Sequence, residues 1–150
     1  MLKPRIAIVV AEFNEDITSS LLQGALTTLA QQQVPIKSSS IFHVPGAVEL
    51  PIAAQRCAMS GQYDVVIVFG AVIKGETDHY DYVAQSVTHG CQQVAIKHNV
   101  PVIFGVLTTP TRIQALDRVG GSRGHHGADA ALTALKTWHA LQDIQARCEV

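Results

Sequence analysis

The sequence predicts a single α/β domain, spanning residues 1–150, in which a four-stranded parallel sheet lies between two layers of helices. Apolar runs of strand length alternate along the chain with longer stretches in which apolar residues recur at helical spacing. The strand-like runs are nearly continuous rather than alternating, as in strands that are covered on both faces. At 150 residues the chain is long enough to bury one such core. The expected architecture is therefore a three-layer α/β/α sandwich.

The order of the expected elements is β-α-β-α-β-α-β-α-α. The expected strands are residues 5–10, 36–43, 64–72 and 101–107, and the run at 64–72 gives the strongest signal. The first expected helix follows Asn14, which is a candidate N-cap, and shows an apolar face from Ile17 to Leu29. The remaining expected helices are residues 46–59, 78–99, 111–119 and 128–147, the last two separated by the glycine-rich residues 120–127.

Strands that alternate with helices predict right-handed crossovers and a parallel sheet. In such sheets, ligands bind beyond the carboxyl ends of the strands. Four segments lie there, and they hold most of the unusual chemistry of the chain: residues 11–14, 44–49, 71–79 and 108–111. The sequence thus predicts a ligand site at that edge.

Composition excludes several classes of function. The chain is 47% hydrophobic and 15% charged, with a formal net charge of −1 and no basic run, which argues against binding to nucleic acid. No apolar stretch has the length of a membrane span, and the first residues show no cleavable signal pattern. The cysteines at 57, 91 and 148 are odd in number and far apart, as expected for thiols in a reduced cytoplasmic compartment.

Residues 74–79, Lys-Gly-Glu-Thr-Asp-His, follow a buried strand and open a helix. Unpaired amides at a helix start and a glycine beside them favour a phosphate cradle, although the segment is not a Walker motif. The alternative is an ordinary turn and helix cap. His79 falls in the first helical turn, where the dipole disfavours the protonated ring, so it is a candidate general acid/base. A surface or capping histidine is the alternative.

Three further residues have both a functional and a structural interpretation. Phe13, at the end of the first strand, would either stack on a planar ring or belong to the core. Glu49 would either accept hydrogen bonds from sugar hydroxyls or stabilise a helix start. Arg118 would either grip a phosphate or lie solvated on the surface. The pair His125-His126 resembles half of a metal site, but no third ligand stands at a suitable spacing, and no metal is expected.

Five segments resemble, in order, the signature blocks of the lumazine synthase family: Phe13-Asn14 and residues 44–51, 70–83, 104–109 and 114–118. The similarity runs from about residue 5 to residue 141. Any one block is weak, but all five occur at compatible spacing. The resemblance implies a flavodoxin-like fold.

The resemblance also implies an activity in riboflavin biosynthesis. The family condenses 5-amino-6-(D-ribitylamino)uracil with 3,4-dihydroxy-2-butanone 4-phosphate to give 6,7-dimethyl-8-ribityllumazine, with release of phosphate and water. No cofactor and no metal take part. The alternative is an assembly of the same fold that binds or stores flavin or another ribityl compound without turnover.

By the same resemblance, His79 would be the proton donor and acceptor, and Phe13 would stack on the pyrimidine. The other implied roles are ribityl binding by Ala47, Val48 and Glu49, backbone contacts to the pyrimidine edge by Ala71, Val72 and Ile73, and phosphate binding by Glu76 and Thr77. Phe104 and Arg118 would come from the neighbouring subunit, with Arg118 on the phosphate. Two residues depart from the family pattern, since Glu12 replaces a common arginine and His126 a common lysine.

The family's assembly unit is a pentamer, and in some members twelve pentamers close into a 60-subunit shell. The short glycine-rich bend at residues 120–127 favours the shell, whereas the short N-terminus lacks the extension that ties neighbours together in many shells. Free pentamers are the alternative. Riboflavin synthase is a further candidate partner.

Overall fold

The computed structural model describes residues 2–76 and 79–148, apart from the side chain of Glu76. Its main sheet has four parallel strands: β1 (Ile6–Ala11), β2 (Ile41–Val44), β3 (Val65–Ile73) and β4 (Val102–Thr109). Their order is β2-β1-β3-β4. This order confirms the predicted parallel α/β sheet and is the one expected of a flavodoxin-like fold, in which the direction of winding reverses beside β1.

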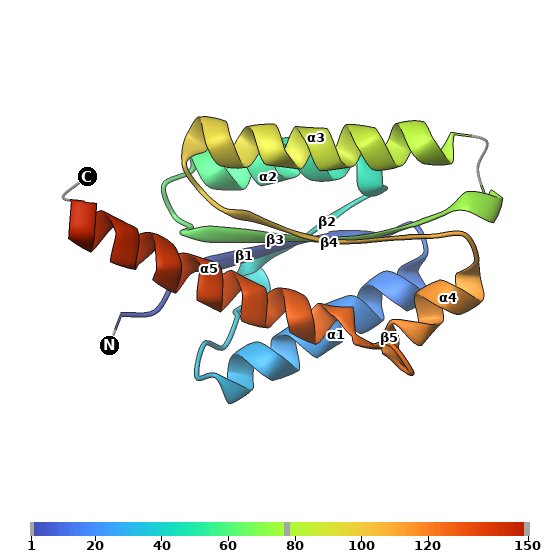
Figure 1. Ribbon diagram of the computed structural model, residues 1–150, viewed down its shortest axis with the longest axis horizontal. Coiled ribbons are helices and arrows are strands. Elements are labelled where there is room, and N and C mark those ends of the chain that lie inside the picture. Colours follow the sequence, from blue (N-terminus) through green and yellow to red (C-terminus); the bar gives the residue numbers. More distant parts are fainter. Residues whose placement is uncertain (1, 77–78, 149–150) are drawn as a thin grey trace.

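Helices cover both faces of the sheet (Figure 1). Helices α1 (Glu15–Gln31) and α5 (His126–Cys148) lie on one face, and α2 (Leu50–Met59) and α3 (Tyr80–His98) lie on the other. Strand β1 is buried along its whole length because its alternate side chains enter two separate cores. Both faces therefore demand apolar residues, which explains the continuous apolar runs in the sequence. Among the described helices, none is long and apolar enough to cross a membrane.

The second strand was predicted at residues 36–43, and this boundary is wrong. Residues 38–40, three serines, form a single 3-10 turn, and β2 pairs with β1 only from Ile41 onward. Serine hydroxyls compete for nearby backbone groups and favour turns over sheet ladders. The strand therefore begins where β-branched Ile41 replaces serine.

The region after β4 also differs from the prediction. The expected helix at 111–119 is shorter, α4 (Arg112–Asp117), and the glycine-rich stretch forms a hairpin of β5 (Val119–Gly121) and β6 (Gly124–His125). Gly120 and Gly124 have positive φ values of 114° and 77°, which glycine adopts without strain. Asp117 accepts hydrogen bonds from the amide and the hydroxyl of Ser122 and so ties the hairpin to α4. These hydrogen bonds, led by that of the hydroxyl, hold the pKa of Asp117 below its usual value.

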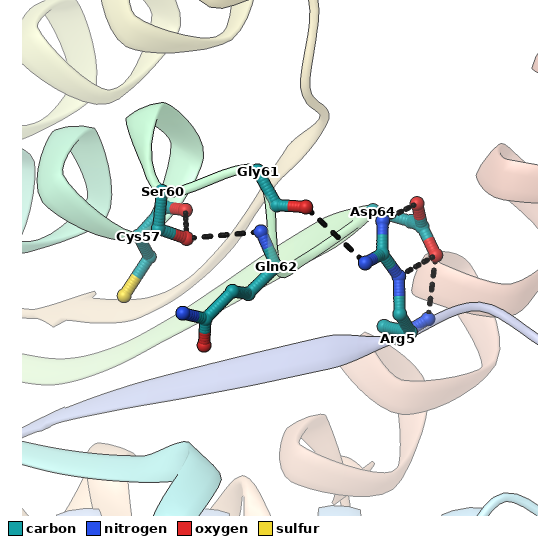
Figure 2. Close-up of polar contacts among 6 residues, drawn as sticks. All are labelled: Arg5, Cys57, Ser60, Gly61, Gln62 and Asp64. Carbon is teal, nitrogen blue, oxygen red and sulfur yellow. Dashed lines mark hydrogen bonds and ion pairs between the residues drawn. The ribbon is translucent and has the colours of Figure 1, made fainter.

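At the amino edge of the sheet, Arg5 and Asp64 join the starts of β1 and β3 (Figure 2). The carboxylate of Asp64 accepts from the backbone amide of Arg5 at 2.8 Å and from its guanidinium at 3.0 and 3.2 Å. Arg5 also donates to the carbonyl of Gly61 in the loop that precedes β3. The arginine hydrogen bonds hold the pKa of Asp64 below its usual value.

We expect Asp64→Asn to lower the melting temperature at pH 7 by about 2–4 °C, because it removes the charge that Arg5 pairs with. The folded-state pKa of Asp64 is depressed, so its contribution is complete above the unfolded pKa of about 4 and is lost as the pH falls through the lower folded value. The deficit of the variant should therefore shrink below about pH 4. A deficit that stays constant between pH 7 and pH 3 in thermal melts would show that the charge is not responsible.

Candidate active site

A cavity of about 530 Å³ opens at the carboxyl edge of the sheet. It lies where the sequence predicted a ligand site, and four segments distant in sequence form its walls. They are Phe13 and Asn14 after β1, residues 45–49 after β2, residues 71–73 at the end of β3, and Val83 in α3. Seven of the predicted substrate-binding residues meet here: Phe13, Ala47, Val48, Glu49, Ala71, Val72 and Ile73.

Phe13 presents its ring at the cavity. Its side chain is 55% exposed, which rules out the alternative that it belongs to the core. The turn that carries it is fixed by two backbone hydrogen bonds, from the amide of Glu12 to Val44 at 2.8 Å and from the amide of Phe13 to Pro45 at 3.0 Å. An exposed aromatic ring on an anchored backbone is suited to stack on a planar ligand.

Asn14 was predicted as the N-cap of the first helix, and it occupies that position without a side-chain capping bond. Asn14 has left-handed dihedrals of φ 62° and ψ 48°. Its Nδ2 instead donates to the carbonyl of Ala71 at 2.9 Å. The backbone carbonyl of Asn14 accepts from Ile17 and Thr18, so α1 starts without a side-chain cap. The amide thereby links two walls of the cavity.

Glu49 stabilises the turn that follows β2. Residues Ala47–Glu49 form a 3-10 turn that leads into α2, and Glu49 Oε2 accepts from the amide of Gly46 at 3.0 Å. The structural interpretation of Glu49 is therefore confirmed. Because a carboxylate offers about four acceptor positions, this bond leaves Glu49 able to accept from a ligand hydroxyl as well.

The predicted phosphate cradle is described only in part. Strand β3 runs into a 3-10 turn, Lys74–Glu76, in which Lys74 and Gly75 are exposed. Thr77 lies outside the described residues, as does the side chain of Glu76. The two phosphate-binding roles therefore remain predictions.

His79 stands immediately before α3, at its N-cap position, rather than within the first turn as predicted. It is exposed, and its ring centroid lies 6.3 Å from that of Tyr82. The carbonyl of His79 accepts from the amide of Val83, which lines the cavity. His79 thus lies one helical turn before a residue of the cavity wall, although it does not itself line the cavity.

Phe104 and Arg118 do not line this cavity. Phe104 lies on the edge strand β4, is 40% exposed, and borders a separate shallow pocket with Tyr82 and Thr108. Arg118 ends α4, where its Nη1 donates to the carbonyl of Gln114 at 2.8 Å. Within one chain these two residues and Phe13 therefore do not form one site.

One histidine of the pair, His125, has a structural role. His125 Nδ1 accepts from the amides of Gly127 and Ala128 at 3.1 and 3.3 Å, and so caps the start of α5. Its ring packs where a side chain on Gly24 of α1 would stand, which explains a glycine within that helix. Among the described residues, no three His, Cys, Asp or Glu side chains form a group that could hold a metal.

A second, more open groove of about 710 Å³ lies between α2 and α3, lined by residues such as Ile52, His89 and Ile96. None of the predicted site residues lies in it. We therefore assign the candidate site to the cavity at the carboxyl edge, because polar and aromatic groups from several segments converge there.

Fold and cavity together define a flavodoxin-like α/β protein with a candidate small-molecule site at the carboxyl edge of its sheet. A family model described as 6,7-dimethyl-8-ribityllumazine synthase matches residues 3–142. A relative of that name from Coxiella burnetii is 48% identical over 141 residues, which cover 94% of this chain and 93% of the relative. Another from Salinibacter ruber is 47% identical, covering 88% and 85%. The chain belongs to the lumazine synthase family.

Proposed function

We propose that the protein forms 6,7-dimethyl-8-ribityllumazine from 5-amino-6-(D-ribitylamino)uracil and 3,4-dihydroxy-2-butanone 4-phosphate. The observation that carries the proposal is the cavity at the carboxyl edge, where seven residues of the expected substrate-binding set meet. Membership of the family and the names of the relatives support it. The presence of both His79 and Arg118 favours turnover over passive binding of a ribityl compound.

In the proposed reaction, Phe13 stacks on the pyrimidine, and the backbone of Ala71, Val72 and Ile73 contacts its edge. Ala47, Val48 and Glu49 hold the ribityl chain, with Glu49 accepting from hydroxyls. The pyrimidine amine attacks the ketone, and a first water leaves to give an imine; removal of a proton then expels phosphate. The resulting enol tautomerises, the ring closes and a second water leaves. His79 transfers the protons, and the other residues supply position.

Phosphate binding completes the proposed site. Glu76 and Thr77 hold the phosphate of the butanone substrate, and Arg118 from a neighbouring subunit pairs with it. Phe104 comes from the same neighbour. The separation of Arg118 and Phe104 from the cavity within one chain supports this division of labour between subunits.

We infer that the working unit is a pentamer, since each site then borrows Phe104 and Arg118 from the adjacent subunit. The short hairpin of residues 119–125 favours closure of twelve pentamers into a 60-subunit shell, with riboflavin synthase as a candidate partner. Light scattering at neutral pH should give a mass near 60 chains for the shell, or near five for the lone ring. An active monomer would contradict the shared site.

The cytoplasm is the proposed location, and three free thiols support it. Cys57 and Cys91 are buried between the sheet and helices α2 and α3, and burial raises the pKa of the Cys91 thiol to about 11. Such a thiol stays protonated and unreactive at neutral pH. Cysteines of this kind serve packing rather than catalysis.

The direct test is to mix the two substrates with purified protein and follow the absorbance of the lumazine together with the release of inorganic phosphate. The proposal expects both products at equal rates, without added metal or cofactor. Saturable binding of the pyrimidine with no enzyme-dependent product would instead identify a binding or storage protein.

A further inference from the structure

Four residues from three separate segments form a polar network beside the cavity. Asn14 Nδ2 donates to the carbonyl of Ala71 at 2.9 Å, and Asn14 Oδ1 accepts from Arg112 Nη1 at 3.2 Å. A second guanidinium nitrogen of Arg112, Nη2, pairs with Asp16 at the start of α1. The network thus connects the turn after β1, the end of β3 and the first residue of α4.

We propose that Arg112 is a positioning residue that holds the Phe13 turn in place through Asn14, and so sets the shape of the pyrimidine side of the cavity. The inference rests on the proposed function, because it assigns Phe13 and Ala71 to the pyrimidine. Arg112 itself does not line the cavity. It acts on the site through the side chain of Asn14.

The direction of the Asn14 amide carries the argument. A side-chain amide has one donating and one accepting end. Arg112 has only donors, so it attracts Oδ1, and this leaves Nδ2 directed at the carbonyl of Ala71. Without Arg112 the amide has no charged donor to fix its orientation, and its bond to Ala71 weakens.

The backbone of Asn14 makes this control important. Its left-handed conformation, φ 62°, is uncommon outside glycine, and although asparagine adopts it more readily than most residues, the surrounding contacts help to hold it. On one side, the backbone amides of Glu12 and Phe13 donate to the carbonyls of Val44 and Pro45. On the other side, the turn is held by the link from Asn14 to Ala71. Phe13 lies in the turn that these two sets of hydrogen bonds hold in place.

The ion pair with Asp16 is a smaller part of the effect. The side chains of Arg112 and Asp16 are 41% and 53% exposed, and pairs so exposed add little to stability. We therefore expect substitutions of Arg112 to act mainly on the binding of the pyrimidine rather than on folding.

The test measures the dissociation constant of 5-amino-6-(D-ribitylamino)uracil, together with KM for each substrate and kcat. Arg112→Ala should weaken pyrimidine binding roughly three- to tenfold, with KM for the butanone phosphate and kcat nearly unchanged. Arg112→Lys should restore part of the affinity, because lysine keeps one donor for Asn14 Oδ1. The matched control is Arg147→Ala, which removes an exposed arginine paired with Asp143 on α5 and should bind normally.

A double-mutant cycle separates positioning from a general loss of structure. Arg112→Ala should add little to Asn14→Ala, since both act through one amide, whereas independent structural losses would add. Pyrimidine affinity at the wild-type level in Arg112→Ala, or additive losses in the cycle, would overturn the inference. Phe13→Ala separates the role of Arg112 from the assignment of the pyrimidine site. If Phe13→Ala weakens pyrimidine binding and Arg112→Ala does not, only the role of Arg112 is wrong. If neither variant weakens binding, the pyrimidine site is wrongly assigned as well.

Discussion

Replacement of His79 by alanine should slow lumazine formation by about two orders of magnitude while leaving the assembly intact. His79 stands exposed before α3, one turn from Val83 in the cavity wall, where an imidazole can exchange protons with a bound substrate. General acid–base groups contribute roughly 10²–10⁴-fold, and the lower end is expected here because positioning survives the change and the substrates are themselves reactive. Steady-state turnover at saturating substrate is the measurement.

The matched control is His139→Ala, an exposed histidine on α5 remote from the cavity walls. It should keep wild-type turnover, and both variants should show the wild-type mass in solution. Wild-type turnover in His79→Ala would remove this residue from the mechanism. A variant that is slow because it no longer assembles would be equally damaging to the proposed role.

Arg118→Ala should act on one substrate. We expect the KM for the butanone phosphate to rise about 10- to 100-fold, the range for losing a hydrogen bond between charged groups, with pyrimidine affinity little changed. Arg118→Lys should recover only part of the loss, because lysine lacks the planar fork that holds phosphate with two bonds. Arg118 ends α4, is half-buried, donates to the carbonyl of Gln114 and does not line the cavity of its own chain, as the proposed contact with a neighbour's substrate requires.

Arg123→Ala is the matched control for Arg118→Ala. Arg123 is exposed in the adjoining hairpin and carries the same charge, but no phosphate contact is assigned to it. Equal weakening of both substrates by Arg118→Ala would indicate a structural role. An equal effect of Arg123→Ala would indicate a diffuse electrostatic attraction instead of a specific contact.

The long apolar elements could be predicted because their pattern is set by local burial. Strand β3 is buried on both faces, and its sequence is almost wholly apolar. The carboxyl edge of the sheet then follows from strand order alone, which is why Phe13, Glu49 and Ala71 were predicted to share a site. The end of α3 was also close to expectation, since Asn99 adopts the left-handed conformation that closes many helices.

Other features depend on partners that no local pattern reveals. The sequence around Asn14 is typical of a helix cap, yet its side chain donates to the carbonyl of Ala71. It also accepts a hydrogen bond from Arg112, which is 98 residues away in the sequence. The hairpin after α4 depends on Asp117 accepting from Ser122, which propensity alone does not predict. The proposed roles of Phe104 and Arg118 could not be predicted from residue spacing, because the spacing within one chain does not show which residues a neighbouring subunit supplies.

If each active site is built from two subunits, two impaired variants should complement each other when turnover is measured at a butanone phosphate concentration well below the wild-type KM, where both are nearly inactive. His79→Ala and Arg118→Ala chains, each carrying a different tag, are co-expressed, and particles that contain both tags are isolated. If His79 and Arg118 act across a subunit boundary, a site is complete when an Arg118→Ala chain meets a His79→Ala neighbour in the right order. Random mixing then restores about a quarter of wild-type activity in a ring. Mixed particles that show only the average of the two parental activities would contradict the shared site.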